Sequence, residues 1–201
     1  MTVNRYLPEG SLYGTAENRE ALASQAMLER AAASGKILEG MAVLCDGEMA
    51  LTVDLGCMRG IIPRGEAVYQ PGGGEARDIA VITRVGKPVC FRVISIERNS
   101  AGESYAVLSR RAAQAECVRC YLSSLIEGDI IPATVTHLEH FGAFVDVGCG
   151  IVSLLSIDCI SVSRISHPAD RFYTGMNLRT VVRSIERDAD GFVTRMYVSN
   201  K

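Results

Sequence analysis

The chain has 201 residues, of which 48% are hydrophobic and 22% are charged, with 19 glycines and 6 prolines. This composition is typical of one or two folded domains and excludes an intrinsically disordered or collagen-like protein. The 21 basic and 23 acidic side chains give a net charge of -2, which argues against a protein that holds nucleic acid or anionic membrane by bulk positive charge.

No signal peptide is recognisable, and no run approaches the roughly 20 apolar residues of a membrane helix. The 7 cysteines are an odd number and lie scattered through apolar segments. Free thiols in a reducing compartment are therefore favoured over a disulfide framework. We expect a cytoplasmic protein without a membrane partner.

Residues 1–36 are predicted to form an N-terminal helical segment. Thr15 is a suitable N-cap for one helix over residues 16–33, which are rich in Ala, Leu, Glu and Gln, and Gly35 ends it. Residues 1–14 contain Pro8 and two glycines, and we expect them to be loosely ordered unless they dock.

The rest of the chain contains one sequence unit twice, at an offset of about 90 residues. VDLGC at 53–57 returns as VDVGC at 145–149, and SIER at 95–98 returns at 184–187. This period far exceeds the 20–50 residues of a solenoid repeat, so each copy should be a whole domain. Only the first copy carries the glycine-rich stretch at 70–74, which lacks the Lys-Ser/Thr ending of a phosphate-binding loop and is interpreted as a flexible loop.

Each copy consists of short alternating segments, such as 91–96 and 143–147, separated by turn residues. About five segments fit each copy, which matches the five-stranded OB-fold barrel. We therefore predict a mainly β protein with two tandem five-stranded OB-fold barrels, an N-terminal helix and a helical linker. The first barrel is assigned to residues 37–111, the linker helix to 112–124 and the second barrel to 125–201.

Two phenylalanines stand out in the second copy. Phe141 and Phe144 are three apart, so a regular strand would point them to opposite faces. A bulge at Gly142 would turn both rings outward while Val145 and Val147 fill the core. Exposed neighbouring rings form a stacking platform for unpaired bases. The alternative, that one or both rings belong to the core, stays open at this point.

The second copy resembles the S1 RNA-binding domain, an OB-fold barrel found repeatedly in bacterial ribosomal protein S1 and in polynucleotide phosphorylase. The resemblance rests on GDI at 128–130, FGAFV at 141–145, GIV at 150–152, HP at 167–168, Gly175 and VSNK at 198–201. It covers residues 125–201, and it reaches residues 37–111 more weakly through the internal repeat. The tandem arrangement is similar to short ribosomal protein S1 homologues.

This resemblance implies that Phe141 and Phe144 stack bases. The family's histidine falls on Ser153, so that contact is expected to be weakened or lost, and its last-strand arginine falls on Arg195. Either Glu186 or Asp188 would be the acidic partner. The remaining candidate RNA-binding residues are His140 beside the first ring and Arg164, His167 and Arg171 in the connection after the third strand, where a basic rim would follow phosphates.

The first copy departs from this pattern. The internal repeat aligns Met49 with Phe141 and Thr52 with Phe144, and neither can stack a base as an aromatic ring does. The resemblance implies that such a degenerate domain docks on ribosomal small-subunit proteins.

No catalytic, cofactor or metal motif is recognisable. Cys117 and Cys120 form one C-x-x-C without a second pair or a suitable histidine. We therefore expect a non-catalytic protein, monomeric off the ribosome, that binds single-stranded, mRNA-like RNA in association with translation. One alternative is an adaptor that docks on ribosomal or RNA-processing partners. Another is a fragment of an RNA-processing enzyme.

Overall fold

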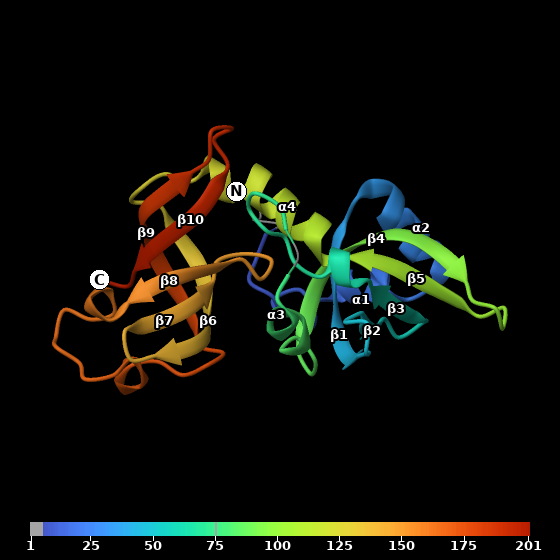
Figure 1. The fold of residues 1–201 in the computed structure, drawn as a ribbon, viewed down its shortest axis with the longest axis horizontal. Coiled ribbons are helices and arrows are strands. Elements are labelled where there is room, and N and C mark those ends of the chain that lie inside the picture. The colour runs from blue at the N-terminus through green and yellow to red at the C-terminus, as the bar shows by residue number, and fades with distance from the viewer. Residues whose placement is uncertain (1–5, 75) are drawn as a thin grey trace. The chain divides into compact units, whose positions relative to one another are not determined.

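The computed structural model describes residues 6–74 and 76–201, which fall into two compact units (Figure 1). One unit comprises residues 9–115, and the other comprises residues 6–8 and 116–201. Each unit contains a closed five-stranded barrel. The predicted fold class, two tandem OB-type barrels with few helices, is confirmed.

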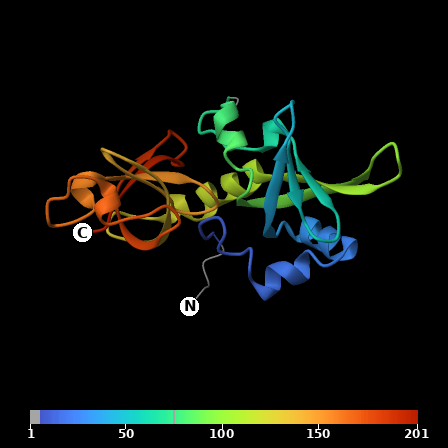
Figure 2. The same ribbon diagram turned by 90° about the horizontal axis from the view of Figure 1, so that it is seen from below.

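The N-terminal segment forms two helices instead of the single predicted one. Helix α1 (Ala16–Ala21) begins at Thr15, whose side chain accepts a backbone N–H as expected. The chain then breaks, and α2 (Gln25–Ser34) begins at Ser24, whose hydroxyl caps it in the same way. Gly35 ends α2 in the left-handed conformation, with φ of 64°. Both helices belong to the first unit and pack on its barrel, as Figure 2 shows.

The first barrel has the strand order β1-β2-β3-β5-β4. Its strands are β1 (Ile37–Cys45), β2 (Leu51–Asp54), β3 (Arg59–Ile62), β4 (Pro88–Arg98) and β5 (Ser104–Ser109). A short helix, α3 (Asp78–Ile82), precedes β4. Fully buried side chains such as Leu51, Val53, Phe91 and Leu108 form the core, because alternate residues of each strand point inward.

The second barrel follows the helical linker α4 (Arg110–Cys120) and has the equivalent order β10-β8-β7-β6-β9. Its strands are β6 (Ile130–Glu139), β7 (Gly142–Asp146), β8 (Val152–Ser156), β9 (Asn177–Arg187) and β10 (Val193–Ser199). Two single turns of 3-10 helix, η3 (Ile157–Cys159) and η4 (Pro168–Asp170), lie in the connection between β8 and β9.

The two barrels agree down to the irregularities in their pairing. The register of β1 against β2 shifts between Ala42 and Leu44, and that of β6 against β7 shifts between Val135 and His137. Each barrel closes through one parallel pair, β3 with β5 and β8 with β10. The internal repeat in the sequence therefore corresponds to one strand plan used twice.

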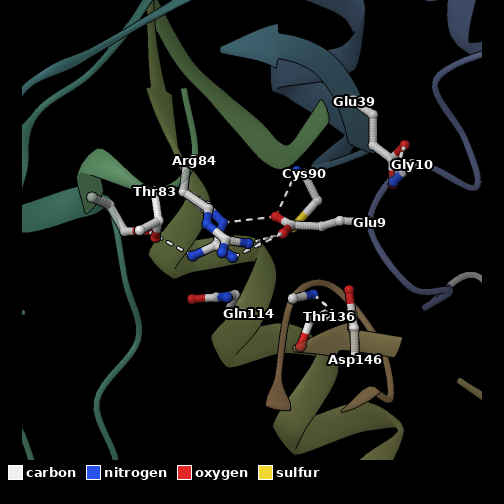
Figure 3. A network of polar contacts seen from close by, with 12 residues as sticks. Glu9, Gly10, Glu39, Thr83, Arg84, Cys90, Gln114, Thr136 and Asp146 are labelled. Carbon is white, nitrogen blue, oxygen red and sulfur yellow. Dashed lines mark hydrogen bonds and ion pairs between the residues drawn. The ribbon is translucent and has the colours of Figure 1, made fainter. Parts of the chain in front are cut away.

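Residues 6–14, which the sequence leaves loose unless docked, are held in place; residues 1–5 lie outside the described residues. Within the first unit, the buried Glu9 accepts two hydrogen bonds from Arg110, at 2.7 and 2.9 Å. It accepts a third from the Cys90 amide at 3.0 Å (Figure 3). Arg84 lies 3.6 Å from the same carboxylate. Burial alone would raise the pKa of Glu9, but Arg110, the Cys90 amide and Arg84 together outweigh this effect, so the pKa lies below its usual range.

A second buried carboxylate fixes the next residues. One oxygen of Glu39 accepts the backbone N–H groups of Gly10, Leu12 and Tyr13 at 2.8–3.0 Å. Burial, together with the nearby Glu9 carboxylate, raises the pKa of Glu39 to about 7, even though these N–H groups favour the ionised form.

Replacing Glu39 with glutamine is expected to remove a pH dependence of stability. The raised pKa means that stability from protonated Glu39 is complete below its ordinary pKa of 4.5 and is lost as the pH rises through about 7. A shift of this size corresponds to about 3 kcal/mol. Urea unfolding at several pH values between 4.5 and 8 measures the free energy of unfolding of the parent chain and of Glu39→Gln. As the pH rises over this range, the variant should gain about 3 kcal/mol of stability relative to the parent chain. A difference that is independent of pH would contradict this assignment.

Candidate nucleic-acid interface

Phe141 and Phe144 lie against each other on the outside of the second barrel. Phe141 is 55% exposed in the turn before β7, and Phe144 is half-buried on β7. Their ring centroids are 6.0 Å apart at an interplanar angle of 89°, an edge-to-face pair. Val145 and Val147 are fully buried, as predicted. The core alternative is wrong for Phe141.

The mechanism predicted for this arrangement is wrong, because Gly142 does not form a bulge. It pairs regularly with Glu139 on one side and Ser156 on the other. Phe141 escapes strand alternation because it precedes the strand. Gly142 is required for another reason, since a Cβ atom there would lie 2.4 Å from the Leu155 carbonyl oxygen.

All three histidines of the chain lie in this region. His137 stacks on Phe144, with ring centroids 6.3 Å apart and an angle of 21°. His140 meets His167 edge-to-face at 4.9 Å. Sequence reasoning missed His137 as a member of the aromatic surface, because strand alternation alone does not show that the β6 register shift places it opposite Phe144.

His167 is oriented by the turn that it begins. Its Nδ1 accepts the Ala169 amide N–H at 3.0 Å, and the Asp170 carboxylate accepts the His167 amide N–H at 3.1 Å. This reciprocal capping of η4 leaves Nε2 of His167 available to a ligand or a neighbour.

Strand pairing extends the aromatic surface around the barrel. His137 pairs with Phe144, Phe144 with Leu154, Leu154 with Tyr197, and Tyr197 with Ser184. Directly paired residues share a face of the sheet, so these five side chains form one outward row, which we call the ring row. It contains one residue from every strand of the barrel.

Ser153, the position where the resemblance puts a weakened RNA contact, is not on this surface. It is 2% exposed, pairs with the inward Val145, and donates its hydroxyl to the Met196 carbonyl at 2.6 Å. The barrel interior therefore removes Ser153 from the candidate interface, and the adjacent Leu154 takes the outward position.

Arg195 is exposed and lies two residues before Tyr197 on β10, so both point to the same face. The register places Glu186 directly opposite Arg195. Asp188, the other candidate acid, accepts the amide N–H groups of Asp190 and Phe192 within the β9–β10 turn. The geometry thus favours Glu186 as the acid facing Arg195.

The predicted loop arginines, Arg164 and Arg171, are exposed in the β8–β9 connection on either side of His167. Neither forms an ion pair with any residue that the structure describes. Their guanidinium groups are accessible to an anionic chain that follows the loop past the rings.

The corresponding row of the first barrel contains no aromatic ring. Its members, by the same strand pairs, are Leu44, Thr52, Ile61, Val107 and Ser95. Met49 lies half-buried in the turn between β1 and β2, with φ of 63°. The loss of rings, predicted at Met49 and Thr52, extends to two more positions, because Leu44 and Val107 stand where the second barrel has His137 and Tyr197.

Residues 6–74 and 76–201 contain no group of three or more His, Cys, Asp or Glu side chains arranged to hold a metal ion. No helix among them is long and apolar enough to cross a membrane.

Residues 124–196, which include every member of the ring row except Tyr197, match the family model described as S1 RNA binding domain. The second barrel is an S1 domain. The S1 domain thus carries the exposed phenylalanine pair, and the first barrel lies outside the matched residues.

Curated relatives align with more of the chain than the S1 domain. Small ribosomal subunit protein bS1 of Neisseria meningitidis is 28% identical over 178 residues, which are 86% of this chain and 29% of that protein. The bS1 homologue of Bacillus subtilis is 33% identical over 143 residues, 69% of this chain and 34% of that protein. The chain therefore spans about a third of the length of these relatives.

Among solved structures, a multidomain protein with nucleic acid binding domains from Streptococcus pneumoniae matches 83% of this chain and 51% of its own. The sequence identity is 16% and the TM-score is 0.32.

Proposed function

We propose that the chain binds single-stranded RNA without catalysing a reaction on it, through stacking of bases on the S1 domain. The observation that carries the proposal is the Phe141–Phe144 pair on the barrel surface, where Phe141 lies exposed beside Phe144 of the ring row. A protein gains little from exposing such rings to water, whereas stacked bases use both their apolar area and their π-faces.

Charge supports a local and not a global attraction for RNA. Residues 125–201 carry 7 basic and 9 acidic side chains, so stacking must supply most of the affinity. Arg195, Arg164 and Arg171 would neutralise individual phosphates around the rings. The names of the curated relatives, which are small ribosomal subunit proteins, favour a role in translation. For this role we propose a single-stranded, mRNA-like RNA as the ligand.

Titration of labelled oligouridine at several salt concentrations tests this function. These three arginine–phosphate contacts contribute about -2 to the slope of log affinity against log salt concentration, because each neutralised phosphate of a single strand contributes about -0.7. A double-stranded RNA of equal length should compete weakly, since its bases are not free to stack.

A second candidate function is protein docking by the first barrel. Leu44 is 56% exposed at the row position that His137 occupies in the second barrel, and Ile94 is 54% exposed beside the row, so the first barrel presents aliphatic surface there. The same titration separates the two functions. Negligible affinity for single-stranded RNA at low salt would contradict the first function and favour the adaptor.

A further inference from the structure

A pocket of about 310 Å³ opens on the S1 domain beside the ring row. It lies among β8, β9, β10 and η3, and Leu154, Tyr197 and Ser184 of the row are part of its lining. Phe144 lies on β7 and Tyr197 on β10, with β8 between them. Two strand spacings, about 9–10 Å, therefore separate the phenylalanine pair from the pocket.

Arg183 supplies the charge of this pocket. It is exposed on β9 at the point where the β9–β10 register shifts, and its guanidinium donates to the Cys159 sulfur at 2.6 Å. No carboxylate within residues 6–74 and 76–201 forms an ion pair with it. Cys159 thus orients the guanidinium over the pocket without neutralising its charge.

The remaining lining combines apolar and polar groups. Leu154 and the Tyr197 ring offer apolar surface, while Ser156 and Ser184 bring hydroxyl groups that have no hydrogen-bond partner among the described residues. A few polar groups converging on an apolar pocket, with one cation at its edge, match the chemistry of a nucleotide, which has an aromatic base and a phosphate.

We propose that this pocket holds one further nucleotide of the bound RNA strand, with its base on Tyr197 and its phosphate on Arg183. This inference rests on the proposed function and deepens it, because it extends the RNA path beyond the phenylalanine pair. An OB fold covers about 4–16 nucleotides, so one strand is long enough to reach both places. The two serine hydroxyls then face the edge of that base.

The test compares Arg183→Ala with Arg179→Ala in the full chain. Both arginines are exposed on β9 and the two variants lose the same charge, but Arg179 pairs with Pro132 and does not line the pocket. Oligouridines of increasing length, within the range of about 4–16 nucleotides, are titrated at several salt concentrations. For the longer oligonucleotides, Arg183→Ala should reduce the salt slope by about 0.7, and Arg179→Ala should leave it unchanged.

A second pair of variants addresses the base. Tyr197→Ala should weaken binding of the longer oligonucleotides on the order of tenfold, as loss of one stacked base does, and Tyr197→Phe should retain it. The shortest oligonucleotides, which the phenylalanine pair alone can hold, should bind all four variants equally.

The outcomes separate this proposal from the function on which it rests. If the parent chain binds oligouridine and Arg183→Ala matches Arg179→Ala at every length and salt concentration, the pocket proposal is overturned and RNA binding stands. Equal affinities of Tyr197→Ala and Tyr197→Phe would likewise overturn it. If the parent chain does not bind single-stranded RNA, both fail.

Discussion

Replacing Phe141 and Phe144 together with alanine should lower the affinity of the chain for oligouridine by about 30-fold or more. Each base stacked on an aromatic ring contributes about 1–3 kcal/mol, and the two rings hold two bases. Anisotropy titration at one fixed salt concentration measures the loss. Because Phe141 is more than half exposed and Phe144 only half-buried, the barrel should remain folded, which circular dichroism would verify.

Tyr173→Ala is the matched control for this variant. Tyr173 is 67% exposed in the β8–β9 connection of the same barrel and is not part of the ring row. Its removal should leave the affinity within about twofold, as expected for a ring that stacks no base. Unchanged affinity in the double phenylalanine variant would eliminate stacking as the mechanism, and an equal loss in the tyrosine variant would show that any exposed ring suffices.

Replacing Glu9 with glutamine should destabilise the first unit by about 3–5 kcal/mol, the usual cost of leaving one partner of a buried ion pair unpaired. Glu9 and Arg110 have 6% and 4% of their side chains exposed, and two hydrogen bonds join them. Urea unfolding at neutral pH measures the change. RNA affinity should persist wherever the variant is folded, because neither residue belongs to the S1 domain.

An exposed ion pair in the same unit provides the control. Arg64 and Asp78 approach to 2.8 Å, but their side chains are 41% and 52% exposed. Solvent screens such a pair, so Asp78→Asn should change the free energy of unfolding by less than about 1 kcal/mol. Similar losses in the Glu9 and Asp78 variants would show that burial does not distinguish the two pairs.

The features that could be predicted are those that the sequence shows directly as residue patterns. Alternating strands, turn residues and a repeat of about 90 residues were sufficient for two five-stranded barrels. The phenylalanine pair was visible as well, because two rings bracketing a glycine are unusual in a strand. The break between α1 and α2 was missed because Ser24 resembles an ordinary helix residue until its hydroxyl is seen capping the next turn.

The missed features of the site depend on which strands pair and in which register. Ser153 points into the barrel because it pairs with the inward-facing Val145. The resemblance instead implied an RNA-contacting position on the surface. His137 faces Phe144 only through a one-residue register shift. The pocket at Tyr197 and Arg183 requires β8 and β10 to pair in parallel, a long-range contact that no local pattern encodes.

The two equivalent rows have a consequence for how such a chain can change. The inward residues of both barrels maintain one strand plan, while the outward row holds the rings of His137, Phe144 and Tyr197 in one barrel and no ring in the other. The outward side chains of such a barrel can therefore be replaced while its inward side chains stay the same. A duplicated barrel of this kind can acquire a new ligand by altering a handful of exposed side chains, while its twin retains the ancestral one.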